Sequence, residues 1–387
     1  MKPINRRDFL KLAGATFVVA AGGSVWRAVD QGMFSAGKGP VYQAWTNWRD
    51  AETPLERIVA AGILASNPHN SQPWIFHITS STIDLFADTN RQIGVIDPFL
   101  REMYIGLGCA LENMILAAEA EGFASSPKLM PDSANETHAV HLDLSPAPPQ
   151  SSKLYSVIPS RHTNRSAYDM RRGISADTLT MINDLVKNEN ARLFWFAEET
   201  EKEKFGQVAT AATEALINDE EQSLDSHAWW RQDWSELQER ADGITLDAQG
   251  LSPFITQAAK FLPDGSRKQN DQIFLKNMRE TNIPLSAAFG ILTVRDGRDN
   301  AQRLECGRIW QRIHLWGTTQ GLALQPLNQM CERVDREAQL NKEFTLTKAV
   351  RGLVNDDDWH AIMPFRIGYP VQESFPSPRR GLEQVLS

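Results

Sequence analysis

The sequence predicts an α+β protein in which two similar halves are fused in one chain. Two long apolar helices are expected, and each lies between glycines at the same spacing, Gly108 to Gly122 and Gly307 to Gly321. Strands are predicted before and after each helix. A proline-rich stretch at 145–149 separates the halves. The chain has 387 residues, which is long enough for two such halves with ample core.

The first half, predicted over 37–150, begins with a clear helix start. Thr53 can cap the helix, Pro54 suits its first position, and Glu56 three residues after Thr53 completes a capping box. This helix is expected to run to about Ala65. Period-two and apolar patterns then predict the following elements: a strand hairpin over 74–78 and 82–87, a central helix over 104–123 and a strand over 138–144.

The second half is predicted over 151–387 and carries extra material. A charged, tryptophan-rich segment at about 200–280 is expected to be a helical insertion, which either packs on the domain or covers a site. A proline- and arginine-bearing arm ends the chain. The other predicted elements are a helix over 175–187, strands over 192–197 and within 284–294, a helix over 305–320 and a strand over 365–368.

Composition excludes several function classes. The formal net charge is -8 at pH 7, whereas a nucleic-acid binder needs a basic face, so no nucleic-acid partner is expected. Three cysteines do not form a disulfide framework, although Cys306 and Cys331 could pair. The chain has no Cys-x-x-Cys, and His69, His77 and His162 lack metal-ligand spacing, so no metal site is expected.

Residues 1–36 are interpreted as an export signal and linker. Asn5-Arg6-Arg7-Asp8-Phe9-Leu10-Lys11 resembles the twin-arginine signal, and an apolar run at 12–21 follows it. That run is short of the roughly 20 apolar residues that span a bilayer. The alternative is an amphipathic helix that begins with two arginines. The signal predicts a periplasmic protein that meets the export machinery, and one that stays membrane-anchored if the segment is not cleaved.

Three polar segments are candidates for a binding site. The loop at 65–74 offers amide donors and acceptors between two rigid elements, which suits a planar heterocycle. If the segment at 160–165 is helical, Arg161 and Arg165 share a face with Thr163 between them and form a phosphate clamp. Arg379 and Arg380 follow two prolines near the C-terminus. Taken singly, each segment also fits a structural role, as a capping loop, a solvated basic turn or a basic tail.

Together these segments resemble the nitroreductase superfamily over roughly 53–387. Asn70-Ser71-Gln72-Pro73-Trp74 is similar to the family's Gln-Pro-Trp loop, and Arg161-His162-Thr163-Asn164-Arg165 to its arginine motif. The central helix at 105–120, the loop at 321–329 and the ending at 365–370 are similar too. The Gln-Pro-Trp loop precedes the arginine motif here, and each occurs once. This order resembles the fused Acg-type branch, in which one pseudo-dimeric chain supplies both sides of a single FMN site.

The resemblance implies roles for individual residues. Arg161, Thr163, Arg379 and Arg380 would hold the FMN phosphate, and Arg165 would approach the pyrimidine end of the flavin. The residues that would line the ring and ribityl chain are Asn67, Pro68, His69 and Asn70. Those that would lie along the reactive edge of the ring are Gln325, Leu327, Asn328 and Gln329. Gln72 and His162 belong to the same motifs and complete the implied site. The family usually has an acidic residue followed by glycine where this chain has Asn328-Gln329. No side chain is expected to be catalytic, because the flavin carries the chemistry.

The implied function is an exported FMN oxidoreductase that acts on nitro compounds or quinones with a small-molecule donor. NADH and NADPH are not expected outside the cytoplasm, so the donor stays open. A second hypothesis is a protein that stores or sequesters FMN with little turnover. A third is a structural protein with a vestigial pocket. The chain is expected to be a monomer, as an internal pseudo-dimer, or a homodimer.

Overall fold

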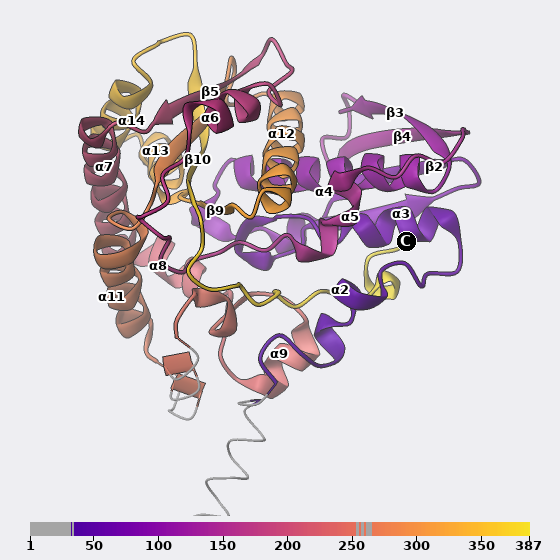
Figure 1. Cartoon of the computed structure of the whole chain (residues 1–387), viewed down its shortest axis with the longest axis horizontal. Coiled ribbons are helices and arrows are strands. Elements are labelled where there is room, and N and C mark those ends of the chain that lie inside the picture. Colours follow the sequence, from indigo (N-terminus) through magenta and orange to yellow (C-terminus); the bar gives the residue numbers. More distant parts are fainter. Residues whose placement is uncertain (1–31, 33–34, 253–254, 257–258, 261–264) are drawn as a thin grey trace, which may run out of the picture.

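The first half is a four-stranded antiparallel sheet with helices on one face (Figure 1). The computed structural model describes residues 32, 35–252, 255–256, 259–260 and 265–387, so the twin-arginine motif lies outside the described residues. In the second strand, the buried positions alternate with half-buried ones, as a sheet with one covered face requires. The elements of this half are α2 (Ala44–Asn47), α3 (Pro54–Gly62), β1 (Trp74–Ile78), β2 (Thr82–Ala87), α4 (Arg101–Ala120), β3 (Phe123–Leu129) and β4 (His138–Pro146).

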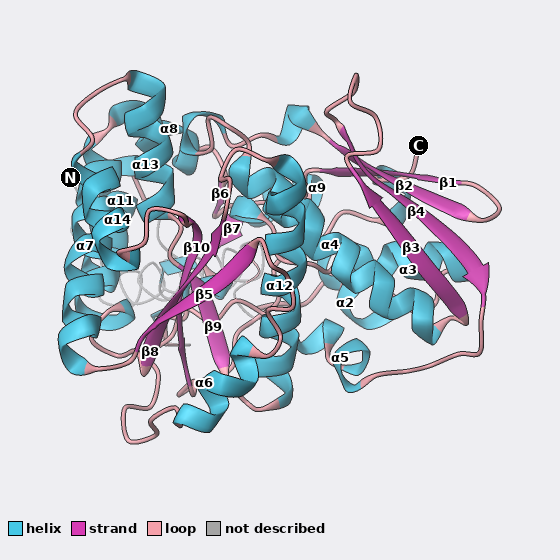
Figure 2. Cartoon of the chain, turned by 90° about the horizontal axis from the view of Figure 1, so that it is seen from above, coloured by secondary structure: helices cyan, strands magenta, loops and turns pink. Residues whose placement is uncertain are grey.

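The second half is also built on a four-stranded antiparallel sheet, and this sheet is buried more deeply. All seven residues of its strand Ala288–Val294 are buried, because helices cover both of its faces (Figure 2). Its elements are α5 (Lys153–Ser156), α6 (Ala176–Asn183), β5 (Ala191–Phe196), β8 (Ala288–Val294), α12 (Asn300–Thr319), β9 (Ala323–Pro326), α13 (Gln329–Leu340), α14 (Thr345–Val354) and β10 (His360–Gly368).

The two halves share one topology. The first sheet has the strand order β1-β2-β4-β3 and the second has β5-β8-β10-β9, so both follow the order first, second, fourth, third. In each half a 20-residue helix, α4 or α12, connects the second strand to the third. The predicted fold class, α+β with two similar fused halves, is therefore confirmed.

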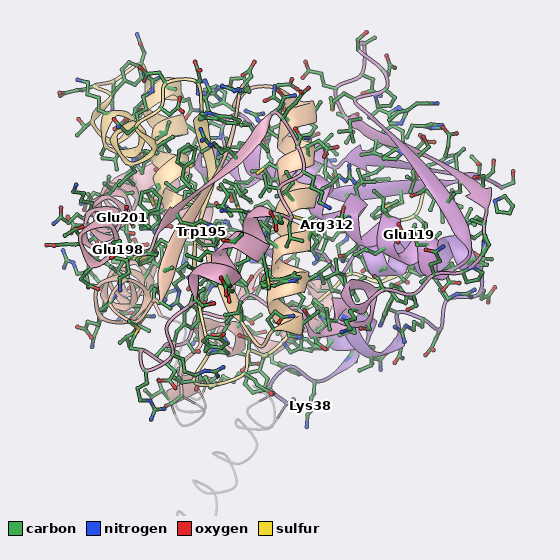
Figure 3. The ribbon with its side chains drawn as sticks, turned by 45° about the horizontal axis from the view of Figure 1, so that its top comes forward. Lys38, Glu119, Trp195, Glu198, Glu201 and Arg312 are labelled. Carbon is green, nitrogen blue, oxygen red and sulfur yellow. The ribbon has the colours of Figure 1, made fainter. Side chains whose placement is uncertain are left out.

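The two long helices α4 and α12 form the seam between the halves, and they pack directly on each other. Gly108 of α4 lies against the backbone of Leu304, and Gly307 of α12 lies against the backbone of Ile105. The contact is reciprocal, as in the interface of a two-fold dimer. Glu112 of α4, fully buried, accepts ion pairs from Arg308 and Arg312 of α12 (Arg312 is labelled in Figure 3). One apolar core continues across this seam.

Two additions distinguish the second half from the first. An insertion between β5 and β8 contains α7 (Glu199–Asn218), α8 (Glu220–His227), β6 (Trp230–Arg231), α9 (Trp234–Arg240), β7 (Ile244–Thr245) and α11 (Arg267–Asn277). The C-terminal arm after Gly368 crosses back to the first half, where Phe76 N donates to Val385 O at 2.8 Å and Ser387 N to Phe76 O at 2.9 Å. The arm therefore ties the end of the chain to strand β1.

Local sequence signals place most elements correctly. Thr53 N donates to Glu56 Oε2 at 2.9 Å and Glu56 N to Thr53 Oγ1 at 3.2 Å, so the predicted capping box forms. A 3-10 helix over Ile158–Ser160 ends just before Arg161, and residues 161–165 are not helical. The helical face on which the predicted phosphate clamp was based therefore does not form. The three cysteines are buried free thiols, and Cys306 and Cys331 do not pair. Among the described residues, no helix is long and apolar enough to cross a membrane.

Candidate functional site

The loop between α3 and β1 has an unusual backbone. His69, Asn70 and Gln72 have positive φ angles of 48°, 55° and 52°, in a region that residues other than glycine seldom occupy. Asn67 Oδ1 accepts from Gln72 N at 2.8 Å and holds the loop closed. Each such residue costs of order 1 kcal/mol or more, and backbone strain of this kind is concentrated at binding and catalytic sites. The loop is therefore shaped by its surroundings and not by local preference.

Two buried arginines converge on the C-terminal end of helix α3. Arg379 Nε donates to Ile63 O at 2.7 Å and its Nη2 to Ala65 O at 3.1 Å. Arg161 Nη2 donates to Leu64 O at 3.2 Å and its Nη1 to Ser66 Oγ at 3.0 Å. A helix C-terminus carries roughly half a negative charge, which does not balance two guanidinium charges. The buried Nε of Arg161 also has no hydrogen-bond partner within the part of the chain that the structure describes.

Arg161, Thr163 and Arg165 lie on one irregular stretch of chain, and all three residues line the same pocket. The one hydrogen bond that the Arg165 side chain makes within the described residues runs from Nη1 to Ala248 O at 3.2 Å. Most of its donor capacity is therefore left for another group.

These side chains surround a pocket between the two halves, and part of the pocket is open to solvent. The first half, the arginine segment, the insertion and the C-terminal arm all contribute to the lining. The lining residues are Trp45, Ser66, Asn67, His69, Asn70, Arg161, His162, Thr163, Arg165, Gly243, Ile244, Ala248, Ser377 and Arg379.

The pocket carries positive charge without a protein counterion. Among the described residues, Arg161, Arg165 and Arg379 form no ion pair with a carboxylate, and Arg161 and Arg379 are only 3% and 5% exposed. Burial lowers the pKa of Arg161 to about 10, and burial together with Arg366 lowers that of Arg165 to about 10. Burial, then the charge of Arg161, lowers the pKa of Arg379 well below its usual value. An anion in this pocket would stabilise all three charges.

The insertion closes one side of the pocket through main-chain hydrogen bonds. Gly243 N donates to Asn70 O at 3.2 Å, and Gln72 Nε2 donates to Ala241 O at 2.8 Å. Gln72 Oε1 accepts from Arg380 N at 2.9 Å, so one buried glutamine joins the loop, the insertion and the C-terminal arm. Gly243, Ile244 and Ala248 of the insertion therefore form part of the pocket wall.

The predicted site residues divide into two groups. The structure brings eight of them together in the pocket lining: Asn67, His69, Asn70, Arg161, His162, Thr163, Arg165 and Arg379. It places the other seven outside that lining: Pro68, Gln72, Gln325, Leu327, Asn328, Gln329 and Arg380.

The segment at 325–329 faces the interior of the second half, because β9 pairs with β10 and the chain then enters α13 beneath α7. Gln325 Oε1 accepts from Arg366 Nε at 2.6 Å, Leu327 is fully buried, Asn328 precedes α13, and Gln329 Nε2 donates to Thr213 Oγ1 at 3.3 Å. The predicted contacts of these residues with a flavin edge have no support in this geometry. Gln325 instead lies behind the arginine segment, where Asn282 Nδ2 contacts both Gln325 Oε1 and Arg165 O.

Pro68 and Arg380 are also displaced from the pocket. The ring of Pro68 packs close to Gly106 of α4. The guanidinium of Arg380 donates to Gln72 O and Gln384 O, so Arg380 fixes the arm and turns away from the lining. Of the two terminal arginines, Arg379 alone reaches the pocket.

Six further residues line the pocket and were not among the predicted site residues: Trp45, Ser66, Gly243, Ile244, Ala248 and Ser377. The ring of Trp45 contacts His162 at 4.5 Å between centroids and the guanidinium of Arg379 at 4.6 Å. Two tryptophans, at 45 and 48, stand in an otherwise polar stretch, and they could have indicated that this segment is buried. Nothing in the sequence of the insertion marks 243–248 as lining.

Acidification should destabilise the ligand-free protein through His162. Burial, then the charges of Arg161 and Arg379, lowers the pKa of His162 from 6.5 to about 3. Between these values the unfolded chain binds a proton that the folded chain rejects, so stability falls as pH decreases from about 6.5. At pH 5 the expected loss is about 2 kcal/mol.

Urea unfolding at pH 7.5 and pH 5 measures this loss, with His162→Gln as the comparison because glutamine does not titrate. The variant should lose about 2 kcal/mol less than the parent over the same interval. An equal loss in both proteins would show that His162 is not responsible.

Comparison with known proteins places part of the chain among named relatives. The putative NAD(P)H nitroreductase Rv3131 of Mycobacterium tuberculosis is 30% identical over 134 residues, which are 34% of this chain and 38% of the relative. The putative NAD(P)H nitroreductase acg of the same organism is 32% identical over 93 residues, 24% of this chain and 28% of the relative. The match to these relatives thus spans well under half of their length. No family model matches the chain.

Solved structures give fainter likenesses. The FMN- and NADPH-dependent nitroreductase NfnB from sphigopyxis sp. strain HMH aligns with 60% of this chain and 97% of its own, at 15% identity and a TM-score of 0.40. NfnB from Mycobacterium smegmatis, in complex with NADPH, aligns with 60% of this chain and 96% of its own, at 14% identity and a TM-score of 0.36. Over these partial stretches, the chain is therefore similar in sequence to nitroreductases that include the Acg protein.

Proposed function

We propose that the pocket between the halves binds one FMN. The observation that carries this proposal is a set of three guanidinium groups that face one pocket without a carboxylate partner among the described residues: those of Arg161 and Arg379, which are buried, and that of Arg165, which is partly buried. A phosphate supplies the missing negative charge and accepts several charge-assisted hydrogen bonds. The unpartnered Nε of Arg161 and the open donors of Arg165 are suited to such a ligand.

The remaining lining fits the rest of the cofactor. Asn67, His69 and Asn70 offer polar groups from a loop that the structure holds rigidly, and Trp45 offers an aromatic face. Thr163 adds a hydroxyl beside the arginines. When bound, FMN would supply hydride or electron transfer. The chain would bind its phosphate, orient its ring against the strained loop and restrict water with the segment Ala241–Ala248.

We propose that the protein is an FMN-dependent oxidoreductase that acts on small molecules such as nitro compounds or quinones. Its similarity to proteins named putative NAD(P)H nitroreductases supports the reaction class. Purified protein loaded with FMN should be mixed anaerobically with NADPH, and separately with dithionite, while flavin absorbance is followed. A reductase that uses NADPH bleaches with both and reoxidises when a nitroaromatic is added. Bleaching with dithionite alone, with no turnover of a nitroaromatic under steady reduction, would contradict the proposal.

One observation favours the alternative that the protein stores FMN. The segment Ala241–Ala248 is fastened to the Asn67–Gln72 loop by hydrogen bonds from Gly243 and Gln72, so access to the pocket is restricted. A storage protein would release FMN slowly and reduce no acceptor in the experiment above. A preparation that takes up no FMN would exclude both functions.

We also propose that the chain is exported through the twin-arginine route and that one chain forms a complete site. The signal-like sequence at 5–11 supports export, which fractionation of producing cells measures. The reciprocal packing of α4 on α12 supports a single chain that already contains the pseudo-dimer. An exported reductase would need an electron donor other than cytoplasmic NADPH. Reduction by dithionite in the experiment above tests the bound flavin without requiring NADPH as that donor.

A further inference from the structure

Two histidines and an aspartate meet on the outer face of the first sheet, away from the pocket. Asp84 on β2 places Oδ1 at 2.8 Å from His138 Nε2 and at 2.6 Å from His141 Nδ1, both on β4. The three ligand-type atoms lie within 4.8 Å of one another. The three side chains are 14%, 17% and 27% exposed, so the cluster is sheltered and still reachable from solvent.

A β-bulge creates this meeting. Residues three apart on a regular strand point to opposite faces of a sheet, so His138 and His141 would normally be separated. The register between β2 and β4 shifts here: Leu85 pairs with Val140 and Phe86 with His138, which leaves Ala139 as the extra residue. Ala139 and Val140 are both buried, and the two histidines consequently lie on the same outer face. Bulges commonly re-aim side chains in this way at functional positions.

The two ring nitrogens of His141 contact two different carboxylates. Its Nδ1 lies 2.6 Å from Asp84 Oδ1, and its Nε2 lies 3.3 Å from Asp143 Oδ1. With a metal ion at Nδ1, the N–H at Nε2 is left to donate to Asp143 Oδ1. A metal-bound histidine that donates its other N–H to a carboxylate is the usual arrangement around protein metal ions.

We propose that Asp84, His138 and His141 form a binding site for a divalent transition-metal ion such as Zn²⁺, with a fourth position open to solvent. Two imidazole nitrogens and a carboxylate oxygen are the donors that such ions prefer. Bonds of about 2.0–2.1 Å at tetrahedral angles separate ligand atoms by about 3.3 Å. The Asp84 contacts therefore open by roughly 0.5 Å on binding, which small rotations of the side chains supply. The site is independent of the flavin pocket.

Remaining parts of the cluster support this assignment. Phe86 stacks on the His138 ring at 4.5 Å between centroids and restricts its rotation. Lys128 forms an exposed ion pair with Asp143 Oδ2 at 3.0 Å, which leaves Asp143 Oδ1 facing His141.

The test is calorimetric titration of the untagged, chelator-treated full chain with Zn²⁺ at pH 7.5. The parent should bind one equivalent. His141→Ala and Asp84→Asn should each weaken that binding at least tenfold, and Asp143→Asn, which removes the carboxylate behind His141, should weaken it by roughly 10–100-fold. Asp84→Asn keeps the size of the side chain, so it remains informative if His141→Ala fails to fold.

His77→Ala is the matched control, because His77 is an exposed histidine of β1 whose ring contacts Ser387 O, outside the cluster. This variant should bind Zn²⁺ like the parent. Titration with Co²⁺ adds an independent readout, since visible absorption bands appear when the ion is held by these ligands and should be missing in Asp84→Asn. No saturable binding by the parent, or binding unchanged in both ligand variants, would overturn the proposal.

Discussion

Replacing Arg161 and Arg165 together by alanine should lower FMN affinity by about 100-fold or more. Each guanidinium donates charge-assisted hydrogen bonds worth about 1.5–3 kcal/mol, and two such losses correspond to at least 3 kcal/mol. The loss should be measurable by fluorescence titration of the apoprotein with FMN, because bound and free flavin differ in emission. The purified double variant should also be nearly colourless.

The single variant Arg165→Ala separates ligand binding from folding. Arg161 supports Leu64 and Ser66 at the end of α3, so its removal also loosens the protein, whereas the Arg165 side chain makes one described hydrogen bond, to Ala248 O. We expect Arg165→Ala to weaken FMN binding at least tenfold with little change in unfolding free energy. Arg171→Ala, with an 89% exposed side chain paired with Asp169, should leave binding unchanged. Undiminished flavin in Arg165→Ala would show that the clamp is misplaced.

Helices and strands whose signals lie within a few neighbouring residues could be predicted from the sequence. Elements that form only because they pair with a strand distant in the sequence could not. The capping box at Thr53, the hairpin over 74–87 and both long helices depend on patterns within a few residues. By contrast β3, β9, α13 and α14 escaped prediction. β3 alternates half-buried and exposed residues, and β9 has only four residues, so their partners β4 and β10 define them.

The candidate site shows the same division. Arg161, Thr163 and Arg165 were identified for a helical face that does not exist, yet all three residues line the pocket from an irregular stretch of chain. The contribution of Ala241–Ala248 could not be predicted, since it depends on where a long insertion folds back. The cluster of His138 and His141 depends on one bulge, and a regular strand would have placed the two rings on opposite faces.

The reciprocal packing of α4 and α12 explains why a larger residue at either crossing glycine should destabilise the protein. Gly108 and Gly307 occupy equivalent places on α4 and α12, and each lets the partner helix approach at its own backbone. A Cβ at Gly108 would lie 2.0 Å from Leu304 O, and a Cβ at Gly307 would lie 2.0 Å from Ile105 O. Main-chain atoms inside buried helices cannot rotate aside as a side chain does, so the helices themselves must separate.

Gly108→Ala should therefore destabilise the protein by about 3 kcal/mol or more, although alanine favours helices by about 1 kcal/mol over glycine. Separation of the helices would also strain the ion pairs of Glu112 and open the core that both halves share. Denaturant unfolding of the purified variant measures the effect, and loss of soluble protein would agree with it. Gly352→Ala is the control, because Gly352 lies in α14 with nothing within 4 Å of its added Cβ, and this change should stabilise slightly. If both variants unfold like the parent, the close crossing of α4 and α12 does not exist, and the pseudo-dimeric seam must be arranged differently.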